Sequence, residues 1–165
     1  MAYSAIKLET HNNIAILTLS RPHVLNAIDD TMASEVVDAC RQIQQDNHVR
    51  VAILTGAGDK AFCAGGDLTE FAQALEEAPT ETLKRMAFRH HIVDAVANLD
   101  RPVIAAINGP ATGGGLELAL ACDVRFAAEE ATLGFRENYL GLIPGIGGCA
   151  RFARLIGVAK AKELI

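Results

Sequence analysis

Three short apolar runs rich in β-branched residues constrain the fold of this chain more than any other feature. They cover residues 14–19, 51–55 and 103–107, and each is followed within a few residues by a Pro or Gly that ends a strand. Two shorter candidate strands follow at residues 123–126 and 132–135. Continuous apolar runs are typical of strands covered on both faces, so the sequence predicts a largely parallel, covered sheet.

Amphipathic helical patterns separate these runs. Asp29 or Asp30 is placed to cap a helix whose apolar face holds Met32, Val36, Val37, Cys40 and Ile43. Thr80 is placed to cap a second helix whose apolar face holds Leu83, Ala87, Ile92 and Val96. The alternation of strand and helix predicts an α/β protein, and no linker composition divides residues 1–165 into more than a single domain.

Composition excludes several classes of function. A formal charge of −5 without any basic run argues against nucleic acid as a partner. No stretch resembles a signal peptide or a membrane span, so we expect no membrane partner and a cytoplasmic protein. The four cysteines lack the CxxC spacing of metal sites, which predicts buried free thiols and no metal.

The glycines at 113, 114 and 115 open a predicted helix and leave its first amides unobstructed. Such a turn can hold a phosphate or a developing oxyanion, but the spacing of the known phosphate motifs is missing. Tight packing of the helix explains the glycines equally well. Thr112 is a plausible cap for this helix.

Glu117 favours a functional interpretation of the glycine run. It is the only charged residue between Arg101 and Asp123 and lies among apolar neighbours, where an acid is costly unless it is paired or used. A glutamate favoured by the helix dipole is the alternative, although Glu117 lies beyond the capping-box position. A second glycine turn, at residues 62–68, leads to another predicted helix with Asp67 as its N-cap, and Gly66 there offers a second amide.

Four segments together resemble the crotonase superfamily, also called the enoyl-CoA hydratase and isomerase family. They are RPHVLNA at 21–27, AFCAGGDLTE at 61–70, NGPATGGGLELALACD at 108–123 and LGFRENYLGLIPGIGG at 133–148. Their order and spacing match the family over nearly the whole chain. The resemblance implies a crotonase-like spiral of repeated strand-strand-helix units, with the last helix cut at the chain end and the family's C-terminal helical region missing.

The resemblance also implies roles for individual residues. The backbone N–H groups of Gly66 and Gly114 would form an oxyanion hole, and Glu117 and Glu137, which are 20 residues apart, would be the two catalytic acids. The segments that contact CoA would supply Leu25, Ala27, Ala64, Gly66, Asp67, Leu68, Thr69 and Gly114. Two positions depart from common family residues, because Thr69 stands where many members have Lys and Arg136 where many have Pro.

An intact glutamate pair favours an enoyl-CoA hydratase, which adds water reversibly across the 2,3 double bond of an enoyl-CoA thioester. An enoyl-CoA isomerase or another crotonase-type acyl-CoA reaction is one alternative, and a truncated, non-catalytic acyl-CoA-binding protein is another. Acyl-CoA is the expected partner and no separate cofactor is expected, since CoA belongs to the substrate. The family forms homotrimers, commonly paired into hexamers, which a chain lacking about its last third would be poorly equipped to build.

Overall fold

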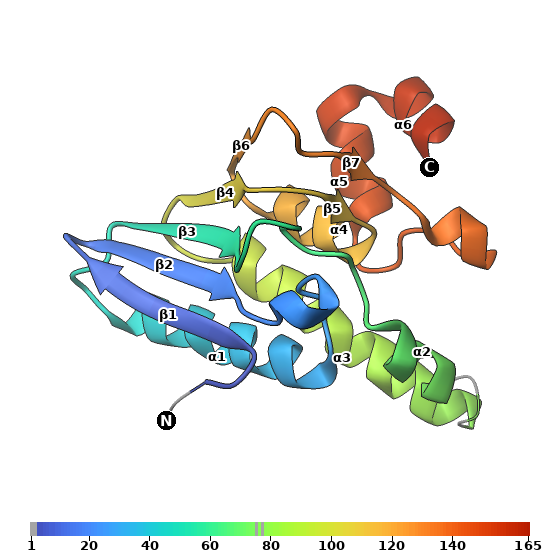
Figure 1. Cartoon of the computed structure of the whole chain (residues 1–165), viewed down its shortest axis with the longest axis horizontal. Helices are drawn as coiled ribbons and strands as arrows, with labels where there is room; N and C mark the ends of the chain where they lie inside the picture. Colours follow the sequence, from blue (N-terminus) through green and yellow to red (C-terminus); the bar gives the residue numbers. More distant parts are fainter. Residues whose placement is uncertain (1–2, 75, 77) are drawn as a thin grey trace.

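A five-stranded sheet forms the body of the protein (Figure 1). The computed structural model describes residues 3–74, 76 and 78–165, with only the backbone at 79, 82, 83 and 86. The strands lie in the order β1-β2-β3-β4-β6. They span Ile6–His11, Ile14–Leu19, Val51–Gly56, Val103–Ile107 and Val124–Ala127, respectively. Every neighbouring pair is parallel except β1 and β2, which are antiparallel.

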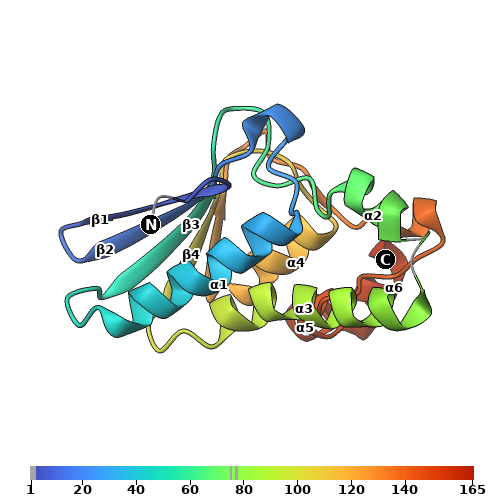
Figure 2. The same cartoon turned by 90° about the horizontal axis from the view of Figure 1, so that it is seen from below.

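The predicted parallel sheet is confirmed, but β1 was not predicted. Its residues alternate between apolar and polar types and are mostly exposed, so it lacks the continuous apolar run of the other strands. The sequence predicted a sheet covered on both faces, but among the described residues only one face of the sheet is covered. In β2 and β3, every second residue is buried and the residues between are half-buried. Helices α1 (Asp30–Gln45) and α3 (Pro79–Ala97) lie against one side of the sheet (Figure 2).

Helix α1 follows its sequence prediction closely. The Asp29 carboxylate accepts a hydrogen bond from the Met32 N–H at 2.7 Å, so Asp29 is the N-cap. Four of the five predicted core residues of this helix are buried, and Val37 is half-buried. The cap and the buried face together fix where α1 begins and which side packs on the sheet.

Helix α3 departs from its prediction at its beginning. Thr80 is not the cap, because Pro79 occupies the first helical position, for which proline's fixed φ is suited, and Ala78 precedes it. Ile92 and Val96 are buried as predicted, whereas Ala87 is exposed. The first half of α3 extends beyond the sheet towards α2 (Leu68–Ala74), which explains the exposure (Figure 2). The predicted burial of Leu83 lies outside the described residues.

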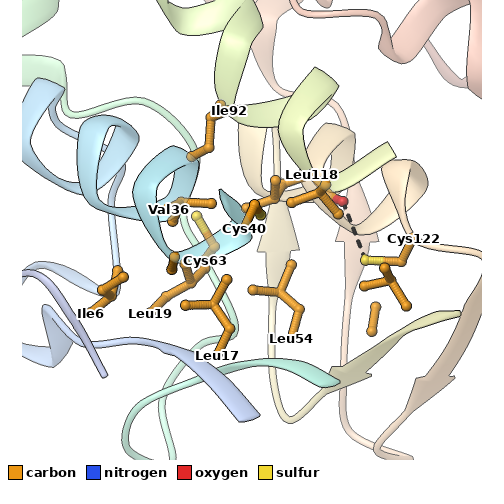
Figure 3. Packing of buried hydrophobic residues seen from close by; sticks show 14 of the residues in the cluster. Ile6, Leu17, Leu19, Val36, Cys40, Leu54, Cys63, Ile92, Leu118 and Cys122 are labelled. Carbon is orange, nitrogen blue, oxygen red and sulfur yellow. Dashed lines mark hydrogen bonds between the residues drawn. The ribbon is translucent and has the colours of Figure 1, made fainter. Parts of the chain in front are cut away.

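The hydrophobic core lies between the sheet and these helices. Leu17, Leu19 and Leu54 point from the strands towards Val36 and Cys40 of α1 and Ile92 of α3 (Figure 3). Cys63 and Cys122 also belong to this cluster, and all four cysteines are free. Cys149 is only half-buried, so the prediction of buried thiols fails for this one residue.

A second, minimal sheet runs beside the first. Strands β5 (Ala111–Thr112) and β7 (Leu133–Gly134) pair in parallel, and single bridges join Ile28 to Gly66 and Cys63 to Ala111. Successive chain segments therefore contribute one strand to the large sheet, one short strand or bridge to the small sheet, and then a helix. This arrangement confirms the predicted spiral of strand-strand-helix units.

The remaining helices complete these turns. Helix α4 spans Gly114–Ala121 and α5 spans Gly148–Ile156, while 3₁₀ turns η1 and η2 span Pro22–Val24 and Glu137–Leu140. Gly157, with a φ of +86°, separates α5 from α6 (Val158–Leu164). Among the described residues, no helix combines the length and apolar composition needed to cross a bilayer.

Candidate active site

Two glycine turns meet where the small sheet gives way to helices. Gly66 forms a single bridge with Ile28 just before α2, and Gly114 is the first residue of α4, separated from the end of β5 by one residue. Backbone hydrogen bonds hold the turns together, with the Thr112 N–H donating to the Cys63 carbonyl at 3.0 Å. The spiral therefore places side by side two segments that are 48 residues apart in sequence, as the Thr112–Ala64 contact also shows.

Glycine is required where these turns touch. A Cβ on Gly65, which has a φ of +96°, would lie 2.9 Å from the Thr112 carbonyl oxygen and 3.2 Å from the Gly114 nitrogen. A Cβ on Gly115 would collide with the Cys63 carbonyl oxygen. Close packing therefore requires glycine at 65 and 115, as one of the two sequence interpretations predicted for the run at 113–115.

The Gly66 and Gly114 amides are available to a ligand. Neither N–H has an acceptor among the hydrogen bonds of the described part of the chain. The Gly66 nitrogen lies 3.7 Å from where a Cβ on Gly114 would be, so the two residues are immediate neighbours. Two free donors beside a helix start suit a developing oxyanion.

Thr112 does not cap α4, contrary to the prediction. Gly113 is the N-cap, with a φ of +52° that few other residues adopt at low cost. The Thr112 hydroxyl instead donates to the Ala64 carbonyl at 3.0 Å. Its hydrogen bond ties the two glycine turns together.

Glu117 is a buried acid on α4 with only 2% of its surface exposed. Its Oε1 accepts hydrogen bonds from the Gly148 N–H at 2.7 Å and the Ile146 N–H at 2.9 Å. Its Oε2 accepts none among the described residues. One carboxylate oxygen is therefore fixed by backbone while the other remains available to a water or a substrate proton.

Burial raises the pKa of the Glu117 carboxyl above its ordinary value, and the nearby Glu137 carboxylate adds to the effect. The N–H groups of Gly148 and Ile146 favour the charged form and offset the burial only in part. A carboxyl with a raised pKa exchanges protons more readily near neutral pH. This property suits an acid or base in catalysis.

Glu137 approaches the same helix start from a different element. It opens η2, and its Oε1 lies 3.0 Å from where a Cβ on Gly113 would be. Its Oε2 accepts the Arg136 N–H at 2.9 Å. The Arg136 guanidinium lies over the Tyr139 ring, 6.0 Å from its centre. The structure thus brings both glutamates and both glycine amides to one place.

Comparison with known proteins agrees with this geometry. The Enoyl-CoA hydratase/isomerase family matches residues 9–165. The chain belongs to this family. It is 46% identical over 155 residues to the putative enoyl-CoA hydratase/isomerase YngF of Bacillus subtilis, covering 94% of this chain and 58% of that protein. It is 41% identical to the crotonyl-CoA hydratase of Syntrophomonas wolfei, covering 100% of this chain and 62% of that protein.

A solved enoyl-CoA hydratase from Bacillus anthracis has the same fold. Its crystal structure superposes with a TM-score of 0.92 at 43% identity and covers 98% of this chain, which corresponds to 62% of the crystallised chain. The chain therefore spans about three fifths of the length of these relatives, from 58% to 62%.

Most of the residues predicted to contact CoA lie in two segments that the fold joins. The Ala64 N–H donates to the Leu25 carbonyl at 3.0 Å, which joins the two predicted segments. Leu25 is 44% exposed and Leu68 is 64% exposed, so both side chains are open to a ligand. Ala64, Gly66 and Thr69 are exposed as well.

Two of the residues predicted to contact CoA instead make contacts within the protein. The side chain of Ala27 is buried, and its carbonyl accepts a hydrogen bond from Arg21 at 2.7 Å. The Asp67 carboxylate accepts from the Thr69 N–H at 2.9 Å, consistent with the predicted N-cap, and pairs with Arg21 at 3.1 Å. Both residues therefore shape the loop that a ligand would approach.

Two structural supports of the site were missed in the sequence. Asn26 is fully buried with a φ of +56°, and its amide donates to the Ala57 and Ala61 carbonyls. The other is the turn at 144–148, whose amides fix Glu117. The dense glycines of that turn were a usable signal, whereas nothing about Asn26 distinguishes it from an ordinary turn residue.

Proposed function

We propose that this protein is an enoyl-CoA hydratase. The observation that carries the proposal is the convergence of Glu117 and Glu137 on the start of α4, beside the free amides of Gly66 and Gly114. Family membership supports the same chemistry. An acyl-CoA thioester is the proposed substrate, with its carbonyl oxygen on the two amides.

The two amides would stabilise the negative charge that develops on the thioester oxygen when water adds to the double bond. Loss of one such donor typically costs about 2.7 to 4 kcal/mol of barrier stabilisation. Glu117 would orient a water and remove its proton as the oxygen attacks C3. Glu137 would supply the proton to C2, and the roles reverse in dehydration.

A hydration assay tests the proposal directly. Crotonyl-CoA is incubated with the wild-type chain, and loss of the conjugated thioester's ultraviolet absorbance is followed together with formation of 3-hydroxybutyryl-CoA. Turnover that disappears in Glu117→Gln supports the proposal. Full hydration by Glu117→Gln would contradict the assigned role of this acid.

Isomerisation of the double bond is the second candidate. The unequal burial of the two acids favours this candidate, because a single buried acid such as Glu117 can move a proton between two carbons without the half-buried Glu137. Incubation with a 3-enoyl-CoA separates the two reactions by product. Binding of acyl-CoA without any reaction would instead support a non-catalytic protein.

Several sequence predictions remain predictions. We propose a cytoplasmic location for the protein. A homotrimer or hexamer is the assembly expected from the family. Light scattering of the purified chain measures its assembly directly.

A further inference from the structure

Arg89 of α3 reaches towards the glycine turn that contains Gly66. Its side chain is only 17% exposed, and Nη2 contacts Glu70 Oε2 of α2 at 2.7 Å. Its Nε lies 3.5 Å from Asp30 Oδ1 at the beginning of α1. The guanidinium is therefore hydrogen-bonded to Glu70 and ion-paired with Asp30, and its buried Nε makes no hydrogen bond among the described residues.

The carboxylates around Arg89 are themselves connected. Glu70 accepts the Asp30 backbone N–H, at 3.1 Å for Oε2 and 3.3 Å for Oε1. Asp30 Oδ2 also pairs with Arg85 at 3.1 Å. Two cations and two anions thus join α1, α2 and α3 at one point. Helix α2 begins at Leu68, two residues after Gly66, so this cluster anchors the segment that follows the oxyanion turn.

The third nitrogen of Arg89 faces Gly66 itself. A Cβ on Gly66 would have Arg89 Nη1 at 3.6 Å as its only non-neighbouring contact within 4 Å. Within the described part of the chain, Nη1 has no hydrogen-bond acceptor. No other described side chain lies within 4 Å of this position, so among the described residues Arg89 alone packs against this side of the Gly66 turn.

We propose that Arg89 is a positioning residue that keeps the Gly66 N–H aimed at the thioester carbonyl. Without Arg89, Glu70 would lose the cation to which it is hydrogen-bonded and Gly66 would lose the side chain packed against it, so the start of α2 would shift. Gly66 would move with it. This inference rests on the proposed acyl-thioester site but not on hydration itself.

Arg85 offers a matched control. It lies one turn before Arg89 on the same helix and pairs with the same Asp30, but Gly66 has no contact with it within 4 Å. Arg85→Met and Arg89→Met each remove one cation from the cluster. Only the second removes the contact with the oxyanion turn.

The probe is 2,4-hexadienoyl-CoA, a conjugated thioester whose absorption moves to longer wavelength when hydrogen bonds polarise its carbonyl. We expect wild type and Arg85→Met to shift the bound probe equally, and Arg89→Met to lose most of the shift. Turnover of crotonyl-CoA by Arg89→Met should fall by about 10- to 100-fold in kcat, with a KM change of less than about threefold, as for a misplaced catalytic group.

Glu70→Gln is the second variant, in case Arg89→Met does not fold by circular dichroism. It keeps the size of the side chain and weakens the anchor of Arg89, so a smaller loss of the shift is expected. An unchanged shift in both variants, or an equal loss in Arg85→Met, overturns the role of Arg89.

The wild-type protein separates this inference from the proposed function. A probe shift without hydration of crotonyl-CoA contradicts the hydratase proposal alone. Hydration with a shift that does not depend on Arg89 contradicts the positioning role alone. A wild type that neither shifts the probe nor hydrates crotonyl-CoA contradicts both.

Discussion

The two glutamates of the candidate site sit in opposite environments. Glu117 is almost fully buried on α4, and two backbone amides from the turn before α5 hold one of its oxygens. Glu137 is half-buried at the beginning of a short 3₁₀ turn, and the only hydrogen-bond donor to its carboxylate in the described chain is the amide of its neighbour Arg136. The residue type is the same, but one acid is fixed by the fold and the other by a local turn.

This difference suggests a division of work between the acids. A fixed carboxylate with a raised pKa can hold a water in one orientation and take its proton. An acid on a surface turn can adjust to different positions of the substrate's C2. The asymmetry predicts that the enzyme tolerates changes at Glu137 better than changes at Glu117.

Glu117→Gln should produce the largest loss of activity. The amide keeps an oxygen for the Gly148 and Ile146 donors but cannot accept the proton of the attacking water. We expect kcat for crotonyl-CoA hydration to fall by about 10³- to 10⁴-fold, the upper part of the range for acid-base catalysis. Steady-state kinetics measure the loss, and calorimetric titration with butyryl-CoA should show unchanged binding. A loss of binding as large as the loss of turnover would assign Glu117 to substrate affinity instead.

Glu137→Gln should have a smaller effect of about 10²-fold on kcat, because water or buffer acids can partly replace a proton donor on a half-exposed turn. Small carboxylic acids added to the assay should restore part of the activity of this variant. The same additives should not rescue Glu117→Gln, whose site is closed to them. Equal rescue of both variants would remove the proposed distinction between a fixed and an adjustable acid.

Gly148→Ala should disturb Glu117, the buried member of the glutamate pair, and leave Glu137 in place. The new Cβ would lie 2.7 Å from both Cγ and Oε1 of Glu117, so the carboxylate must move. We expect kcat to fall about tenfold and the free energy of unfolding to fall by about 1 to 3 kcal/mol, as for other overpacked sites. Gly145→Ala in the same turn is the control, because its Cβ would meet nothing closer than 3.9 Å. Similar losses in the two variants would point to the turn backbone rather than to Glu117.

Much of this organisation was predictable from the sequence. Strands β2 and β4 and the cap at Asp29 follow from local signals, namely apolar runs and a capping acid. A buried acid beside a glycine-rich helix start also stood out on chemical grounds. Its assignment to an oxyanion hole and a glutamate pair came from the resemblance.

The features that were missed depend on contacts between distant segments. Strand β1 has too few buried residues to show an apolar run, and Thr112 resembles a cap until its hydroxyl is seen to bind the Ala64 carbonyl. The support of Glu117 by the Gly148 amide spans 31 residues, and the contact of Arg89 with Glu70 spans 19. Local periodicity carries no information about such pairs.

The smallest predicted effect concerns stability and pH. Burial raises the pKa of Glu117 above its ordinary value of 4.5, so the folded protein binds this proton more tightly than the unfolded chain does. The corresponding stability is present at low pH and is lost as pH rises from 4.5 through the raised pKa. Glu117→Gln lacks this dependence. Urea unfolding at several pH values should therefore show wild type gaining stability relative to Glu117→Gln as the pH falls from about 7 towards 5.

The exposed Glu130 supplies the control for this measurement. Glu130→Gln makes the same chemical change at an exposed side chain, so comparing the two variants isolates the effect of burying Glu117. If wild type instead lost stability relative to Glu117→Gln on acidification, the Gly148 and Ile146 amides would outweigh burial. Glu117 would then be a carboxylate held for its charge, and Glu137 would be the better candidate for the acid that exchanges protons.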